Sequence, residues 1–224
     1  TRFAEIERIG HWLLAVSFIV LAVTGLNITY GKYFLLPLLG KSAFSALSIG
    51  GKWLHNYVAF AFMAGLAMTL VLWIKDNFPD KHDFMWLAKG GGMFSKGVHP
   101  PSKKFNAGQK ILFWAVIWGG LALSLTGIAL LFPFQIDFPA GMEPIQQMQF
   151  ATMWHAIIAL VLTIIVIAHI YIGSMGMEGA FDAMGTGEVD ENWAREHHSV
   201  WAKEVSKSRR GRKARAKAKA APAE

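Results

Sequence analysis

Two histidines lie in the last long apolar run of the chain, residues 151–173. His155 and His169 are fourteen positions apart, which on a helix is about 21 Å along the axis and about 40° around it. Ionisable residues are costly inside a segment of membrane-spanning length, and by default they mark functional sites. One face of this helix is therefore expected to carry an imidazole near each membrane surface, as a helix that holds two stacked haems requires.

The surrounding sequence predicts the elements that position these side chains. Four apolar segments, residues 12–30, 54–74, 111–132 and 153–173, each have the length of about 20 residues that crosses a bilayer. The chain is 54% hydrophobic and only 17% charged, which fits a membrane protein with several spans. We expect an all-α fold, a four-transmembrane-helix bundle, over residues 1–200.

The basic residues predict how this bundle is oriented. The connection between the second and third segments holds seven lysines, whereas the connection between the third and fourth holds no basic residue. Ten lysines and arginines follow the fourth segment. Since basic connections stay inside, the second connection and both termini are predicted to be cytoplasmic, as in a multi-pass protein of a bacterial inner membrane.

Orientation then sorts four histidines by depth. His55 begins the second segment and His155 begins the fourth, so both are expected near the outer surface. His11 precedes the first segment and His169 ends the fourth, so both are expected near the inner surface. Two level pairs of imidazoles on facing helices suit two b-type haems, each held by two axial histidines. Histidines in membrane helices also serve as interhelical hydrogen-bonding groups, and that alternative stays open for each one taken singly.

A haem-ligating imidazole needs an acceptor for its second nitrogen. For the fourth segment the sequence offers the carbonyls four residues back, at Ala151 and Ile165. The first and third segments also align weakly, with Thr24-Gly25 matching Thr126-Gly127. We interpret five glycines in these segments either as close helix contacts or as room for a flat macrocycle: Gly25, Gly65, Gly119, Gly120 and Gly127.

The start of the third segment is unusually polar. Asn106 and Gln109 are spaced as a capping box, which explains them as helix initiators. They also lie at the predicted depth of His11 and His169, and Gly108 between them would let a flat ring approach the backbone. A quinone site at Asn106, Gly108, Gln109 and His169 is therefore the second interpretation.

Composition narrows the remaining chemistry. The chain has no cysteine, so it contains no disulfide, iron–sulfur ligand or covalent c-type haem attachment among its own residues. Histidines 82, 99, 197 and 198 are expected to be solvated loop residues. Residues 201–224 are predicted to be a basic, disordered cytoplasmic tail near anionic lipid headgroups, and a nucleic-acid partner is not expected.

Several stretches resemble one family, the gamma (cytochrome b) subunit of membrane-bound respiratory formate dehydrogenase. The resemblance covers residues 3–203, and its markers are GHW (10–12), NFPDKHDFMWL (77–87), FNAGQK (105–110), the segment with the two histidines and WAREHH (193–198).

The resemblance implies a four-helix electron-transfer subunit of an oxidoreductase. It implies two haem b groups, an outer one at His55 and His155 and an inner one at His11 and His169. It further implies that menaquinone or ubiquinone is reduced near the inner haem, at Asn106, Gly108 and His169. An iron–sulfur subunit and a molybdenum or tungsten subunit, where formate is oxidised, are the implied partners, within a possible higher oligomer.

Two other interpretations remain open. The cytochrome b subunit of a nickel–iron hydrogenase or thiosulfate reductase would use the same chemistry with a different electron donor. A haem-free membrane anchor or transporter would use the histidines for other purposes.

Overall fold

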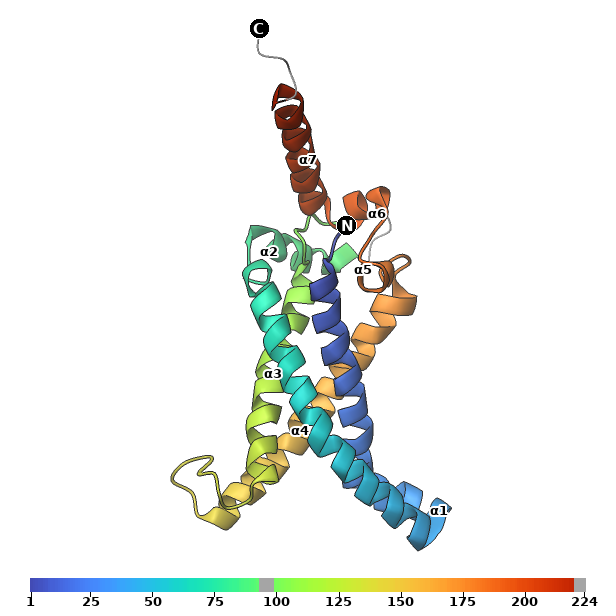
Figure 1. The fold of residues 1–224 in the computed structure, drawn as a ribbon, viewed down its shortest axis with the longest axis vertical. Helices are drawn as coiled ribbons and strands as arrows, with labels where there is room; N and C mark the ends of the chain where they lie inside the picture. Colours follow the sequence, from blue (N-terminus) through green and yellow to red (C-terminus); the bar gives the residue numbers. More distant parts are fainter. Residues whose placement is uncertain (93–98, 220–224) are drawn as a thin grey trace. The chain divides into compact units, whose positions relative to one another are not determined.

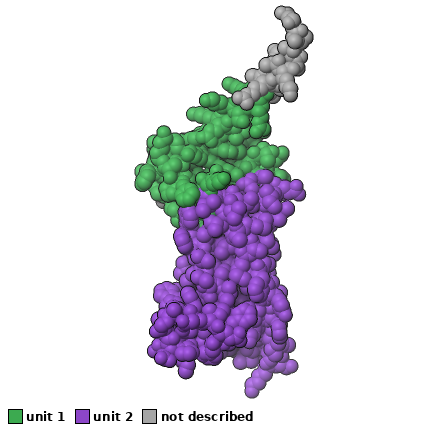
Figure 2. All heavy atoms as spheres, turned by 60° about the vertical axis from the view of Figure 1, so that its left-hand side comes forward, with its two compact units in different colours: residues 1–3, 75–113, 178–224 green, residues 4–74, 114–177 purple. Residues whose placement is uncertain are grey.

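The structure is a computed structural model that describes residues 1–92 and 99–219, and these residues form helices and connections without any strand. The chain divides into two compact units, coloured separately in Figure 2. Unit 1 comprises residues 1–3, 75–113 and 178–224, and unit 2 comprises residues 4–74 and 114–177. Unit 1 therefore joins the lysine-rich connection before α3 to the C-terminal segment.

Helix α1 (Glu5–Trp73) begins unit 2 and contains two antiparallel segments, 5–39 and 41–73. A straight helix of its 69 residues would be roughly 100 Å long, far more than the ~30 Å of a bilayer core. The break is at Gly40, whose φ of 76° and ψ of 168° lie outside the helical region; positive φ is readily adopted only by glycine. Figure 1 shows that α1 folds back on itself. The predicted connection between the first two segments is therefore mostly helical.

Two further long helices complete unit 2. Helix α3 (Ala107–Leu131) begins in unit 1 and continues into unit 2, and α4 (Pro144–Tyr171) is extended by a π-helical turn, η3 (Ile172–Gly176). Proline at the first position of α4 explains its early start, because a missing N–H costs nothing there. Counted as continuous helices, α1, α3 and α4 with its extension are long and apolar enough to cross a membrane.

Small residues bring the segments of unit 2 into contact. A Cβ on Gly65 would lie 2.8 Å from the backbone nitrogen of Leu14, so the two segments of α1 touch backbone to backbone. A Cβ on Gly119 would lie 2.7 Å from the side chain of Leu162 in α4. These positions are close helix contacts of the kind that replaces hydrophobic burial as the packing force in membranes.

The outer surface of unit 2 is apolar. Of the most apolar window of α4 and its extension, only 6% is buried inside the structure. Large side chains such as Ile164 and Ile167 are exposed on this helix, as are Val23 on α1 and Trp118 on α3. This exterior matches the hydrocarbon environment that the sequence predicts.

Unit 1 contains short helices and a buried ion cluster. Its helices are α2 (Lys81–Ala88), α5 (Asp182–Gly185), α6 (Glu191–His197) and α7 (Ser199–Lys219), with single 3₁₀ turns at Ile74–Asp76 and Gly90–Gly92. The ammonium group of Lys110 donates to Asp80 at 2.9 Å and to Asp83 at 2.8 Å. Burial raises the pKa of Asp80, but the bonds from Lys110 and the backbone of His82 lower it more, so it lies below its ordinary value.

His198 corrects one prediction from the sequence. Its side chain is 1% exposed, whereas the sequence predicts a solvated residue. The ring Nδ1 donates to the carbonyl oxygen of Lys103 at 2.7 Å, and the hydroxyl of Ser102 donates to the carbonyl of His197. His198 thus links the C-terminal segment to the loop before α3. Among the other histidines predicted to be solvated, His99 has its Nε2 atom 2.8 Å from a carboxylate oxygen of Glu196.

Helix α7 covers most of the segment for which the sequence predicts a disordered tail. Its lysine, arginine and alanine residues are good helix formers. The basic, weakly hydrophobic composition that predicts disorder therefore also favours a helix. Residues 220–224 lie outside the described part of the chain.

Burial of His198 predicts acid sensitivity of unit 1. Burial, followed by the charge of Arg2, lowers the pKa of His198 from 6.5 to about 3. The unfolded chain therefore binds one more proton between these values, and stability is lost as pH falls from 6.5. The slope is at most about 1.4 kcal/mol per pH unit. Asparagine preserves the donor to Lys103 but does not titrate. We expect His198→Asn to show a flatter pH dependence of the thermal unfolding midpoint in detergent; an unchanged slope would contradict this assignment.

Candidate functional site

The four histidines predicted as ligands form two pairs in unit 2. The ring centres of His55 and His155 are 6.4 Å apart, and those of His11 and His169 are 6.3 Å apart. The ring planes are inclined at 63° and 68°. The structure thus pairs the histidines in the same way as their predicted depths in the membrane. In each pair α1 supplies one ring and α4 the other, so two antiparallel segments and one continuous helix position both pairs.

The spacing within each pair fits a metal between two imidazoles. Metal–nitrogen bonds of about 2 Å on opposite sides of one ion place the ring centres roughly 6 to 6.5 Å apart. A third metal ligand is absent nearby, since no cluster of three or more histidine, aspartate or glutamate side chains that could hold a metal ion occurs within the described ranges 1–92 and 99–219. Two imidazoles with no third protein ligand suit an ion whose remaining ligands come from a macrocycle, as in b-type haem.

Threonine hydroxyls hold both rings of the pair predicted to be outer. Thr24 Oγ1 lies 2.9 Å from His55 Nδ1, and Thr126 Oγ1 lies 2.9 Å from His155 Nδ1. The carbonyl of Ala151, which the sequence suggested for His155, is thus replaced by a side chain from α3. The missed signal was present in the sequence: the aligned Thr-Gly pairs precede these histidines by 31 and 29 residues.

The glycines that follow these threonines lie against the same rings. A Cβ on Gly25 would approach Cε1 of His55 to 3.3 Å, and one on Gly127 would approach Cε1 of His155 to 3.2 Å. A methyl group at either position would press on the imidazole. The five glycines predicted to serve packing or a macrocycle thus divide into two groups, since Gly65 and Gly119, with Gly120 against Leu66, contact aliphatic residues or backbone instead.

The pair predicted to be inner has aromatic surroundings. His11 lies edge-on to Trp12 at 5.2 Å between ring centres and 6.3 Å from Trp73. The indole of Trp73 donates to the carboxylate of Glu7 at 2.8 Å, which ties the two segments of α1 together beside the pair. His11 Nδ1 is buried without a hydrogen-bond partner among the described residues.

The quinone candidates near the start of α3 have structural roles of their own. Asn106 N–H donates to Gln109 Oε1 at 3.1 Å, and Gln109 N–H donates to Asn106 Oδ1 at 2.9 Å. This is the capping box that the sequence offers as the alternative. A Cβ on Gly108 would lie 3.0 Å from the indole of Trp86, so this glycine also makes room for a side chain. These three residues belong to unit 1 and His169 to unit 2.

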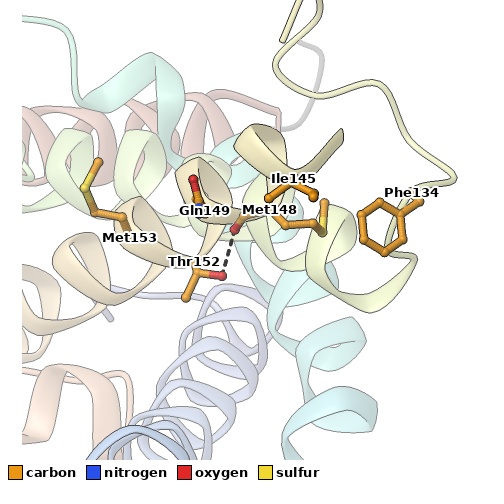
Figure 3. A pocket seen from close by; sticks show the side chains of 6 residues that line it. All are labelled: Phe134, Ile145, Met148, Gln149, Thr152 and Met153. Carbon is orange, nitrogen blue, oxygen red and sulfur yellow. Dashed lines mark hydrogen bonds between the residues drawn. The ribbon is translucent and has the colours of Figure 1, made fainter. Parts of the chain in front are cut away.

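A shallow apolar pocket of about 420 Å³ lies at the beginning of α4 (Figure 3). Its polar side chains are Gln149 and Thr152, and the hydroxyl of Thr152 donates to the carbonyl of Met148 at 2.8 Å. The remaining lining is apolar, from Phe134, Ile145, Met148 and Met153. It contains none of the predicted site residues.

Apolar helices of membrane-spanning length that present histidines in facing pairs define a class of protein, the membrane cytochromes of b type. Comparison with known proteins places the chain within this class. Residues 2–187 match the family described as prokaryotic cytochrome b561, and the chain belongs to that family. Membership implies binding of b-type haem.

Similar proteins of known role agree with the resemblance seen in the sequence. The nitrate-inducible formate dehydrogenase cytochrome b556(Fdn) subunit of Escherichia coli K12 is 27% identical over 207 residues, 91% of this chain and 90% of that protein. The formate dehydrogenase cytochrome b556(fdo) subunit of the same strain is 28% identical over 208 residues, 92% and 93% respectively. The formate dehydrogenase cytochrome b556 subunit of Haemophilus influenzae Rd is 27% identical over 205 residues, 88% and 79%. The predicted resemblance to formate dehydrogenase cytochrome b subunits is confirmed.

The contact between Gly127 and His155 allows a test of whether this pair of histidines holds a haem. Valine at position 127 would push the imidazole away from its facing ring, because its branched side chain exceeds the space beside Cε1. We expect Gly127→Val to lower haem affinity at this pair by roughly tenfold or more, the lower end of the usual effect of outer-shell changes. The measurement is the haem-to-protein ratio by pyridine haemochrome during purification.

Gly50 provides the matched control. A Cβ at this position meets nothing within 4 Å, so Gly50→Val should keep the full haem content. Equal haem content in the two variants would show that the space beside His155 is not needed.

Proposed function

We propose that the chain is the cytochrome b membrane subunit of a formate dehydrogenase. It would be a four-span bundle with cytoplasmic termini, formed by residues 5–39 and 41–73 of α1 with α3 and α4. His55 and His155 would ligate an outer haem b, and His11 and His169 an inner one. When bound, the haems would carry electrons singly from an iron–sulfur partner at the outer face to quinone at the cytoplasmic side.

The observation that carries this proposal is the equality of the two pairs. Their ring centres are 6.4 and 6.3 Å apart, although the histidines come from three helical segments and distant parts of the sequence. Hydrogen-bonded interhelical histidines would have no reason to repeat this spacing. Two protein ligands on opposite sides of each ion would also close both axial positions to substrate, which favours electron transfer over oxygen activation.

Helix α4 connects the two pairs in this proposal. It runs without a break from Pro144 to Tyr171 and therefore holds both of its histidines on one rigid rod. Their fourteen-residue separation corresponds to about 21 Å along the axis, within the ~30 Å hydrocarbon core. The chain itself thus keeps two ligand sites at a fixed separation across the membrane.

Formate dehydrogenase is favoured over hydrogenase or thiosulfate reductase by the similar proteins. The three described above are all cytochrome b subunits of formate dehydrogenases, and they align with 88 to 92% of this chain. An iron–sulfur subunit and a molybdenum or tungsten subunit are accordingly the proposed partners. Co-purification of a molybdopterin subunit would identify formate dehydrogenase as the electron donor, whereas co-purification of a nickel–iron subunit would identify a hydrogenase.

Removal of one outer ligand tests the haem assignment. The wild-type chain should contain two b haems, and His155→Ala should contain one, because a single imidazole from His55 would leave one axial position of that haem empty. Formate-to-quinone electron transfer should stop while formate oxidation with a soluble dye continues. His82→Ala is the control, since His82 belongs to unit 1. A wild-type chain without haem, or an H155A variant with normal transfer to quinone, would refute the proposal.

We further propose that quinone is bound at the polar start of α3, by Asn106, Gly108 and Gln109. The capping box uses the side-chain oxygens of Asn106 and Gln109, so their NH₂ groups are the atoms that a quinone carbonyl would contact. These donors lie at the start of α3, within unit 1, close in sequence to the buried Lys110 that contacts two carboxylates. Ionisable groups at this end would also supply a route for protons.

Aspartate at position 106 separates capping from quinone binding. It keeps the oxygen that accepts from Gln109 N–H but replaces the NH₂ donor with a second oxygen. We expect Asn106→Asp to raise the quinone KM about tenfold, the equivalent of one lost hydrogen bond of ~1.4 kcal/mol, with haem content unchanged. Asn192→Asp in α6 controls for the added charge. An unchanged KM in N106D would mean that Asn106 only caps the helix.

A further inference from the structure

The hydroxyl groups of Thr24 and Thr126 can be assigned as acceptors toward the histidines. Thr24 Oγ1 lies 2.7 Å from the carbonyl oxygen of Val20 in its own helix, and Thr126 Oγ1 lies 2.7 Å from that of Ala122. A carbonyl can only accept, so the single hydroxyl hydrogen is used there. The oxygen then has only lone pairs to offer His55 and His155.

The ring nitrogens that face these oxygens must therefore carry the hydrogen. With Nδ1 protonated in the neutral ring, Nε2 of each histidine has the free lone pair.

We propose that Thr24 and Thr126 are positioning residues that select the Nδ1–H tautomer of His55 and His155 and present Nε2 of both rings to the haem iron. This inference rests on the proposed function. Each threonine comes from the segment that precedes its histidine, residues 5–39 for His55 and α3 for His155. The glycine that follows each threonine leaves space for Cε1 of the same ring. One Thr-Gly pair thus sets both the tautomer and the orientation of the imidazole.

The two threonines should also influence the midpoint potential of the haem that His55 and His155 would hold. A ligand that donates a hydrogen bond through its second nitrogen becomes more basic and stabilises the ferric over the ferrous state. The haem held by His55 and His155 should consequently have a lower midpoint potential than the same haem would have without the two threonine hydroxyls. His11 Nδ1 has no such acceptor among the described residues, so the same effect is not built into that ring.

The experiment compares valine and serine at each position in the purified complex. Valine keeps the shape of threonine and removes the hydroxyl, while serine keeps the hydroxyl. We expect Thr24→Val and Thr126→Val each to raise the midpoint potential of one haem, by up to tenfold in the ferric/ferrous ratio or about 59 mV, and to alter its ferric low-spin EPR signal. Thr24→Ser and Thr126→Ser should retain wild-type values.

Thr163 of α4 is the matched control, because its hydroxyl bonds the carbonyl of Ala159 in the same way but is given no histidine partner by the structure. Thr163→Val should leave both potentials unchanged. Wild-type potentials and EPR signals in T24V and T126V, or equal shifts in T163V, would overturn the inference. Absence of haem from the wild-type chain would instead refute the proposed function, so the two failures are distinguishable.

Discussion

An imidazole inside hydrocarbon has to find its hydrogen-bond partner within the protein, because water is absent there. This constraint explains much of unit 2. Thr24 and Thr126 serve His55 and His155, and the helices must therefore pack in the register that brings a threonine opposite a histidine. Glycines at positions 25 and 127 follow from the same requirement, since a Cβ at either position would lie only 3.3 or 3.2 Å from the imidazole.

The buried polar groups of unit 1 also find their hydrogen-bond partners within the protein, among charged side chains and backbone carbonyls. Lys110 is buried but contacts two carboxylates, and His198 is buried but donates to a carbonyl. Breaking such buried pairs costs several kcal/mol, because one partner then stays desolvated and unpaired. Residues that resemble ordinary loop charges in the sequence therefore hold the short helices of this unit together, which leaves the start of α3 well defined.

Much of this could be predicted from sequence, because membrane spans and charge bias are local properties. Apart from Ile74 and Phe132, the apolar segments lie within α1, α3 and α4 with its extension, and depth alone gave the pairing of histidines that the structure has. What could not be predicted depends on the register between helices. Thr126 becomes the partner of His155 only when α3 and α4 are docked, so the intrahelical carbonyl at Ala151 seemed the nearer choice. The burial of His198 and the division into units likewise depend on contacts between distant segments.

The unbroken course of α4 has a consequence for how sequences of this type can vary. Inserting one residue between His155 and His169 would turn the second ring by about 100° around the axis, away from its partner on α1. The partners themselves lie in segments joined through the turn at Gly40, where extra residues would lengthen a hairpin end without rotating either ring. Changes in length should therefore be rare within the central part of α4 and common around residue 40, a pattern imposed by helical geometry.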